Sequence, residues 1–267
     1  MSCYAPWVPA GSSSKRPVRC GQCIGCRLEY SRQWAVRIMH EASMHESNSF
    51  VTLTYKESPE SLVYSDYQMF MRRLRKARGN SRFFCAGEYG ELKARPHFHA
   101  VLFGVGFDDG EYLGKSDAGF KLYCSDALSE LWPLGFASYG SVTFESAAYV
   151  ARYVVKKVTG ELADFHYAGR VPEFARMSLR PGIGQSWLEK YWSDVFPSGK
   201  VVSRGFVANA PRYYRKKFAA KFPLLAREMS FRQMEDSQNE IEEQFPSRLA
   251  AKEAVTGARL RMLKRKI

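Results

Sequence analysis

Residues 82–104, RFFCAGEYGELKARPHFHAVLFG, decide the fold more than any other part of this 267-residue chain. Apolar and aromatic side chains crowd its two ends, residues 82–88 and 97–104, in the way that is typical of buried strands. Between these ends, Gly90 and Pro96 disfavour a continuous strand. The stretch therefore predicts two antiparallel strands that are joined by a loop, a β-hairpin.

Helical and strand patterns alternate on both sides of this hairpin. Apolar spacing and helix-stop signals predict helices at residues 26–45, 65–78, 125–132 and 146–158. β-Branched and aromatic content predicts further strands at residues 48–55 and 136–144. This order of elements favours an α+β fold over repeated βαβ units. We expect an antiparallel sheet of about five strands with helices packed on its faces.

The C-terminal part of the chain carries weaker signals. It predicts a helix at residues 186–195, a strand at 200–207 and a basic helical run in PRYYRKKFAAKF at 211–222. Residues 227–267 are polar and charge-rich, which predicts an extended helical or partly disordered tail. The expected regions are an irregular cysteine-containing segment (1–26), an α+β domain with an extension (27–208) and a basic, charged tail (209–267).

The charge of the chain points to an anionic partner. Its 40 Lys and Arg residues outnumber its 27 Asp and Glu residues, which gives a formal net charge of +13. Nucleic acid is the simplest partner for such a balance. A hydrophobic content of 45% and a charged content of 25% are ordinary for a globular chain and argue against wholesale disorder.

Composition also predicts the compartment. No stretch approaches the ~18–20 uninterrupted apolar residues of a membrane span, and the first twenty residues lack the apolar centre of a secretory signal. The six cysteines are too few and too unevenly placed for a disulfide framework. We therefore expect reduced thiols, no membrane partner and a protein that stays in the cytosol where it is made.

The sharpest local motif is His97-Phe98-His99, in the second strand of the hairpin. Alternate side chains of a strand share a face, so both imidazoles project together and can ligate one divalent metal. Glu88 on the partner strand is well placed as a third ligand, and this donor set suits Mg²⁺ or Mn²⁺. The alternative is that the two histidines are unrelated surface or hydrogen-bonded residues.

A second motif lies on the helix predicted at residues 146–158. Tyr149, Tyr153, Lys156 and Lys157 crowd one stripe of that helix. A phenol is a poor nucleophile near its ordinary pKa of about 10, but a nearby ammonium favours the phenolate and neutralises charge on a phosphate. The stripe therefore suits phosphoryl transfer. The alternative is that the tyrosines are half-buried packing residues alongside lysine stems.

The N-terminal cysteines form a third motif, CGQCIGC at residues 20–26. Cys20, Cys23 and Cys26 can place three thiolates around Zn²⁺, with Cys3 as a fourth ligand. Free thiols packed beside the first helix are an equally good interpretation, because two separated CxxC pairs are missing. A redox role is disfavoured, since no thioredoxin-like βαβ context is present.

Two basic clusters are candidates for DNA contact. Cations meet phosphates while neighbouring aromatic rings stack on bases in proteins that bind single strands. In most proteins such clusters are simply solvated helix faces. The candidates are Arg72, Arg73 and Arg75 in one helix, and Arg212, Tyr213, Tyr214, Lys216 and Lys217 in the basic run.

Three segments of the chain follow the order of the three motifs of HUH endonucleases, which initiate rolling-circle replication. The chain as a whole resembles the replication initiators of the Microviridae, specifically the gokushovirus branch, over about residues 3–215. The three segments are FVTLTY (50–55), RPHFHAVLF (95–103) and YVARYVVKK (149–157). The resemblance to the gokushovirus branch extends to CGQCIGCRLEYSRQWAVR (20–37), GEYG (87–90) and RPGIGQ (180–185).

The resemblance implies an HUH-type sheet and a nicking reaction. His97, His99 and Glu88 would hold the metal, which polarises the scissile phosphate. Tyr149 or Tyr153 would attack, leaving a 5′-phosphotyrosyl protein and a free 3′-hydroxyl that primes the host polymerase. The other tyrosine would then act in rejoining the product strand.

The family scheme also implies what surrounds the reaction. Lys156 and Lys157 would stabilise the pentavalent phosphate or tune the phenols. Transesterification conserves the phosphodiester energy, so no nucleotide cofactor is expected. The sequence shows no GxxxxGK[ST] segment, so a host helicase would unwind the DNA. The expected setting is single-stranded viral origin DNA in the cytoplasm of the bacterial host.

Two other classes of protein have similar composition. A non-catalytic nucleic-acid binding module of RRM-like topology would also carry a basic antiparallel sheet, but it has no reason to align Glu88, the His-x-His pair and the two tyrosines around one site. A basic phage structural protein that packages DNA is disfavoured by the patterned core and by six scattered cysteines.

Overall fold

The computed structural model describes residues 3–11, 17–90, 93–116, 119–156, 162–238 and 245–262, without the side chains of 153–156, 162 and 234–238. The chain divides into two compact units. The sheet unit is Trp34–Trp187, and the terminal unit combines Met1–Gln33 with Leu188–Arg265. Helix α1 (Ile24–Ala42) contributes residues to both units, and each unit is considered by itself.

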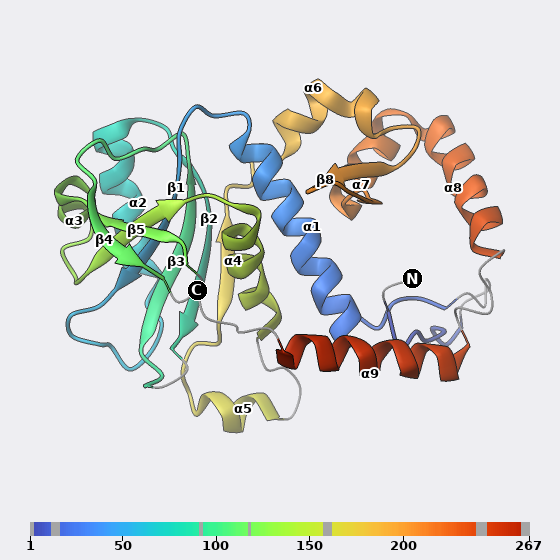
Figure 1. Ribbon diagram of the computed structural model, residues 1–267, viewed down its shortest axis with the longest axis horizontal. Helices are drawn as coiled ribbons and strands as arrows, with labels where there is room; N and C mark the ends of the chain where they lie inside the picture. The colour runs from blue at the N-terminus through green and yellow to red at the C-terminus, as the bar shows by residue number, and fades with distance from the viewer. Residues whose placement is uncertain are drawn as a thin grey trace. The chain divides into compact units, whose positions relative to one another are not determined.

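The sheet unit is built on a seven-stranded sheet in the order β4-β5-β6-β1-β3-β2-β7, whose neighbouring strands are all antiparallel (Figure 1). The predicted hairpin is present as β2 and β3, and the predicted antiparallel α+β class is confirmed. The strands are β1 (Asn48–Thr54), β2 (Arg82–Tyr89), β3 (Pro96–Phe103), β4 (Glu111–Lys115), β5 (Lys121–Cys124), β6 (Ala137–Ser141) and β7 (Phe174–Met177).

The prediction of about five strands was too low. The patterns missed β4, β5 and β7, because these short strands expose or half-expose their side chains and so lack a clear apolar alternation. The strand predicted at 200–207 belongs to a separate hairpin, β8 (Lys200–Ser203) with β9 (Phe206–Asn209). The chain turns between them at Arg204 and Gly205, whose φ angles are 54° and 76°.

Alternation along the strands divides the core of the sheet unit into two layers. On one face, residues such as Leu53 and Phe98 pack against α2 (Tyr64–Arg78) and α3 (Asp126–Leu131). On the other face, residues such as Val101 pack against the second half of α1 and against α4 (Phe144–Lys156) (Figure 1). These four helices confirm the predicted ones, although residues 157–158 of the last lie outside the described residues.

A buried charge anchors the loop at residues 180–185, which no motif explained. Glu41 of α1 is 2% exposed, accepts a hydrogen bond from the backbone N–H of Gly184 at 2.6 Å and pairs with the guanidinium of Arg82. Arg37 donates to the carbonyl oxygen of Ile183 at 3.0 Å. These contacts connect helix α1, strand β2 and this loop within the sheet unit.

The sheet unit also contains a short helix, α5 (Leu162–Tyr167), which was not predicted.

The terminal unit is mainly helical. Its helices are the first half of α1, most of α6 (Gln185–Val195), α7 (Arg212–Lys221), α8 (Pro223–Gln238) and α9 (Pro246–Met262). Rings pack between them, and Phe196 stacks on Phe218 with centroids 3.9 Å apart. The described part of the predicted tail is thus helical. No helix in the described ranges is long and apolar enough to cross a membrane.

Candidate functional site

The register of the central strands brings Glu88, His97 and His99 together. Glu88 lies opposite His97 in the β2–β3 pair, and His99 follows two residues later on the same face of β3. Glu88 Oε1 lies 2.7 Å from His97 Nε2 and 3.0 Å from His99 Nε2. The three ligand atoms lie within 4.8 Å of one another. We call these three residues the histidine cluster.

Neighbouring polar groups orient both imidazoles. His97 Nδ1 lies 3.1 Å from the carbonyl oxygen of Arg95, and His99 Nδ1 lies 3.0 Å from Thr52 Oγ1. A carbonyl oxygen only accepts, so Nδ1 of His97 carries the hydrogen and the Nε2 lone pair of the neutral ring faces Glu88. A lone pair cannot donate to a carboxylate. The contact therefore requires either a protonated imidazole or a cation between the two groups, which is the arrangement of histidine ligands in metal sites.

Electrostatics also favours a cation here. Glu88 is 4% exposed, and burial raises its pKa. Hydrogen bonds from His97 and His99 and their charges outweigh that effect, so the pKa of the Glu88 carboxyl is lowered overall. A buried carboxylate thus stays ionised beside two imidazole nitrogens. This donor set fits a divalent metal ion.

Helix α4 places the predicted nucleophile Tyr149 over the histidine cluster. The ring of Tyr149 lies edge-on to that of His99, with centroids 5.2 Å apart and an interplanar angle of 83°. Phe50 stacks on His99 at 5.6 Å and holds the imidazole from another side. The guanidinium of Arg152 lies 5.7 Å from the Tyr149 ring centroid. Motifs from β1, β3 and α4 thus converge on one place.

The other predicted residues of α4 are described only in part. Tyr153 and Lys156 belong to the helix by their backbone, but their side chains lie outside the described residues. Lys157 lies outside them altogether. Tyr153 follows Tyr149 by one helical turn, so the two positions share a face of α4.

Thr52 and Arg152 were not singled out as site residues by the sequence patterns. Thr52 lies in the FVTLTY segment of the first motif, and its hydroxyl contacts His99. The contact could be predicted only once the strand register was known, because Thr52 lies opposite His99 in the β1–β3 pair. Arg152 precedes Tyr153 in the motif, yet its contact with the Tyr149 ring depends on the helix fold.

The three arginines predicted for DNA contact in α2 lie on the opposite face of the sheet from the histidine cluster, since α2 covers the other core layer. Arg73 donates to the carbonyl oxygen of Leu131 at 3.4 Å, and Arg75 donates to that of Ser81 at 3.3 Å. Arg72 is exposed. Their contact with DNA away from the histidine cluster stays a prediction.

The basic run forms α7 of the terminal unit. Arg212, Lys216 and Lys217 are exposed, and Tyr213 is half-buried. Tyr214 is fully buried within its unit, so its ring is not available for stacking on a base. The exposed cations of α7 remain candidates for DNA contact.

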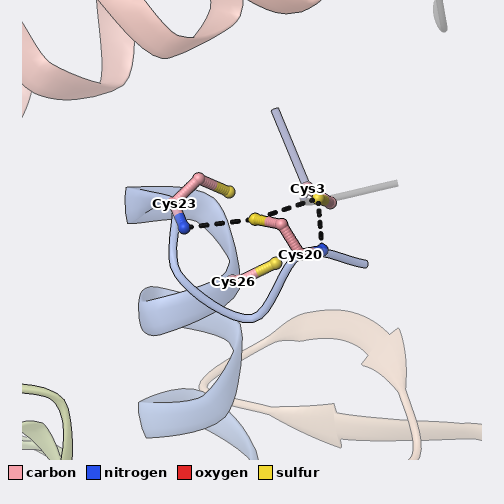
Figure 2. Close-up of side chains that lie close together, drawn as sticks. All are labelled: Cys3, Cys20, Cys23 and Cys26. Carbon is pink, nitrogen blue, oxygen red and sulfur yellow. Dashed lines mark hydrogen bonds between the residues drawn. The ribbon is translucent and has the colours of Figure 1, made fainter. Parts of the chain in front are cut away.

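The four N-terminal cysteines meet in the terminal unit (Figure 2). The sulfur atoms of Cys3, Cys20, Cys23 and Cys26 lie within 4.8 Å of one another, and we call them the cysteine cluster. Burial raises the pKa of the Cys26 thiol to about 12. Burial also opposes ionisation of Cys23, but hydrogen bonds from the backbone of Tyr4 and Cys26 prevail and lower its pKa to about 6. Cys3 thus joins the three cysteines of the CGQCIGC motif.

Comparison with known proteins agrees with this placement of motifs. A family model described as replication-associated protein ORF2/gene 2 protein matches residues 48–158, which include the histidine cluster and Tyr149. The chain is 35% identical over 218 residues to "Replication-associated protein VP4" of Bdellovibrio phage phiMH2K, covering 76% of this chain and 68% of that protein. No solved structure matches the chain.

Two further relatives carry similar names. The chain is 34% identical over 201 residues to "Replication-associated protein ORF2" of Spiroplasma virus 4, covering 69% of this chain and 61% of the relative. It is 30% identical over 212 residues to "Replication-associated protein ORF4" of Chlamydia phage 1, covering 74% and 53%. The chain thus spans between about half and two thirds of the length of these relatives. With its motifs in order and its relatives among phages, the chain belongs to the family of phage replication-associated proteins.

Proposed function

We propose that this protein is a metal-dependent HUH endonuclease and strand transferase that nicks single-stranded viral origin DNA. The observation that carries the proposal is the edge-on contact of the Tyr149 ring with His99, a member of the histidine cluster that could hold a metal ion. A packing tyrosine has no need of such neighbours. A mere nucleic-acid binder has no need of the buried carboxylate between two histidines.

Each residue of the site has a separate role in the proposed reaction. Glu88, His97 and His99 would hold Mg²⁺ or Mn²⁺, which when bound polarises the scissile phosphate. The phenolic oxygen of Tyr149 attacks the phosphorus, the bond to the 3′ oxygen breaks, and the departing oxygen takes up a proton. The products are a 5′-phosphotyrosyl protein and a DNA strand with a free 3′-hydroxyl. Phosphodiester energy is conserved, so the reaction needs no nucleotide cofactor.

The second tyrosine completes the cycle in this proposal. Tyr153 attacks the regenerated origin after one round, and the 3′-hydroxyl then displaces Tyr149 and circularises the product strand. Lys156 and Lys157 stabilise charge on the phosphate. Arg212, Lys216 and Lys217 add salt-sensitive affinity for the DNA backbone. The host polymerase extends the 3′-hydroxyl and a host helicase unwinds the duplex, in the cytoplasm of the bacterial host.

A covalent adduct is the decisive test. The protein is incubated with single-stranded segments of the phage genome and Mn²⁺ or Mg²⁺, and adducts are resolved on a denaturing gel and located by mass spectrometry. We expect one segment to yield an adduct on Tyr149 or Tyr153 and a free 3′-hydroxyl. A Tyr149→Phe/Tyr153→Phe variant should form none.

Tyr112→Phe is the matched control, because Tyr112 is 58% exposed on β4 and lies outside the site. This variant should nick like the parent protein. Salt-dependent binding of single strands without an adduct on any segment, with either metal, would overturn the proposal and favour a non-catalytic binding module.

A further inference from the structure

We propose that the cysteine cluster binds one structural Zn²⁺ ion through Cys3, Cys20, Cys23 and Cys26. The site shares no residue with the histidine cluster and does not depend on the nuclease proposal. Figure 2 shows the four thiols close together: Cys3 comes from the N-terminal segment, Cys20 and Cys23 from the stretch just before α1, and Cys26 from the first turn of α1.

The sulfur geometry fits a tetrahedral zinc site. Four sulfurs at ~2.3 Å from zinc stand about 3.8 Å apart along the edges of the tetrahedron. Cys3 Sγ and Cys20 Sγ are 3.7 Å apart, and all four sulfurs lie within 4.8 Å. A disulfide would need an S–S distance of about 2.05 Å, and all four cysteines are free.

Backbone amides already surround the sulfurs as in a metal site. Cys20 Sγ accepts hydrogen bonds from the N–H groups of Gln22 and Cys23, at 3.4 and 3.3 Å. Cys3 Sγ accepts from Cys20 N–H at 3.3 Å, and Cys23 Sγ accepts from Tyr4 N–H at 3.2 Å. Such donors stabilise thiolates rather than neutral thiols. Metal binding displaces the thiol protons, and four thiolates this close together are stable only with a cation between them.

The donor set selects the metal and its role. Thiolates are soft ligands, and a tetrahedral set of four indicates zinc or iron rather than Mg²⁺ or Mn²⁺. Four protein ligands leave no open position for substrate, which is the arrangement of structural zinc sites. The site therefore holds chain segments together instead of taking part in the nicking reaction.

The N-terminal segment needs such a fastening because it buries little apolar surface. Trp7 and Val18 pair across an isolated β-bridge, but they remain 52% and 41% exposed. A segment with so little core of its own opens easily. Zinc would tie Cys3 and Cys20 at the two ends of this loop to the first turn of α1. Tyr4 extends the connection to α9 through a 2.8 Å hydrogen bond with Thr256.

The test measures metal content on the full chain. Protein purified under reducing conditions is analysed by inductively coupled plasma mass spectrometry, and about one zinc per chain is expected. Replacement of zinc by Co²⁺ should produce the strong visible bands of tetrahedral cobalt and sulfur-to-cobalt charge-transfer absorption. Cys20→Ser should lower the bound zinc to less than about a tenth per chain.

Two controls show whether the zinc is held by these four cysteines. Cys124→Ser should keep its zinc, because Cys124 lies on β5 outside the cluster. His97→Ala/His99→Ala should also keep it, so a failure of the nuclease proposal leaves this result untouched. Zinc-free protein with four reactive thiols, a disulfide within the cluster, or iron in place of zinc would each overturn the proposal. If Cys20→Ser does not fold, the zinc content and cobalt spectrum of the unchanged protein decide alone.

Discussion

The histidine cluster and the cysteine cluster are built in opposite ways. The first stands on two neighbouring strands, β2 and β3, whose ladder hydrogen bonds fix the positions of Glu88, His97 and His99 in the absence of metal. The second stands on an N-terminal loop and the first turn of α1, where Trp7 is half exposed and little core supports it. The histidine cluster is therefore preorganised by the sheet, whereas metal binding at the cysteine cluster would itself stabilise the surrounding fold.

Removal of metal should distinguish the two units most strongly. A strong chelator takes zinc from the cysteine cluster and any divalent ion from the histidine cluster. Amide exchange should then accelerate at least about tenfold in residues 3–11 and 17–26 of the terminal unit, because these segments lose their support. The central strands β1 and β3 should exchange as before. The measurement is hydrogen exchange followed by mass spectrometry.

Addition of zinc alone supplies the control, since it should restore slow exchange in the terminal unit. Equal acceleration in both units, or none in either, would remove the contrast between a preorganised and a metal-dependent centre.

A smaller effect should come from the orienting hydroxyl of the histidine cluster. Thr52→Val removes the hydrogen bond to His99 Nδ1 while keeping the shape of the side chain. Loss of such an outer partner lowers metal affinity about 10–100-fold. We expect this loss for Mn²⁺ in a calorimetric titration, with the zinc content unchanged.

Thr54→Val is the matched control, because Thr54 lies opposite His97 but its hydroxyl donates to the carbonyl oxygen of Phe136 at 3.0 Å and not to an imidazole. It should bind Mn²⁺ as the parent does. Equal weakening by both substitutions would indicate a general loosening of β1 rather than a specific role for Thr52.

A further predicted effect concerns acid and the sheet unit. Burial lowers the pKa of His40 to about 4, and its ring stacks on Trp187 with centroids 3.5 Å apart. The unfolded imidazole has a pKa near ~6.5, so the unfolded state binds more protons between these values. The stability that the neutral ring contributes is fully present above about pH 6.5 and is lost as pH falls toward about 4, a change of about 3 kcal/mol.

Denaturant unfolding of metal-free protein at several pH values measures this change. His40→Leu should lose less stability than the parent over the same interval, because no proton binds at that position. The same slope in both proteins would assign the acid sensitivity to other groups.

Much of the histidine cluster followed from local patterns. Alternation places His97 and His99 on one face, and the short hairpin puts Glu88 opposite them. The edge of the sheet was harder, since β4 and β7 expose much of their length and carry no apolar alternation. The burial of Tyr214 could not be predicted from the sequence, because a tyrosine in a basic run can face either solvent or a core.

The sequence by itself determined the antiparallel hairpin, the order of the motifs, the positive charge and the family that they indicate. These are local or compositional properties, which depend on spacing along the chain. Only the tertiary structure decided that Tyr149 lies against His99, that Thr52 orients that imidazole and that Cys3 joins three cysteines from beyond its own segment. Such contacts join residues that are far apart in sequence. They depend on how the elements pack in three dimensions, which the spacing of residues along the chain does not determine.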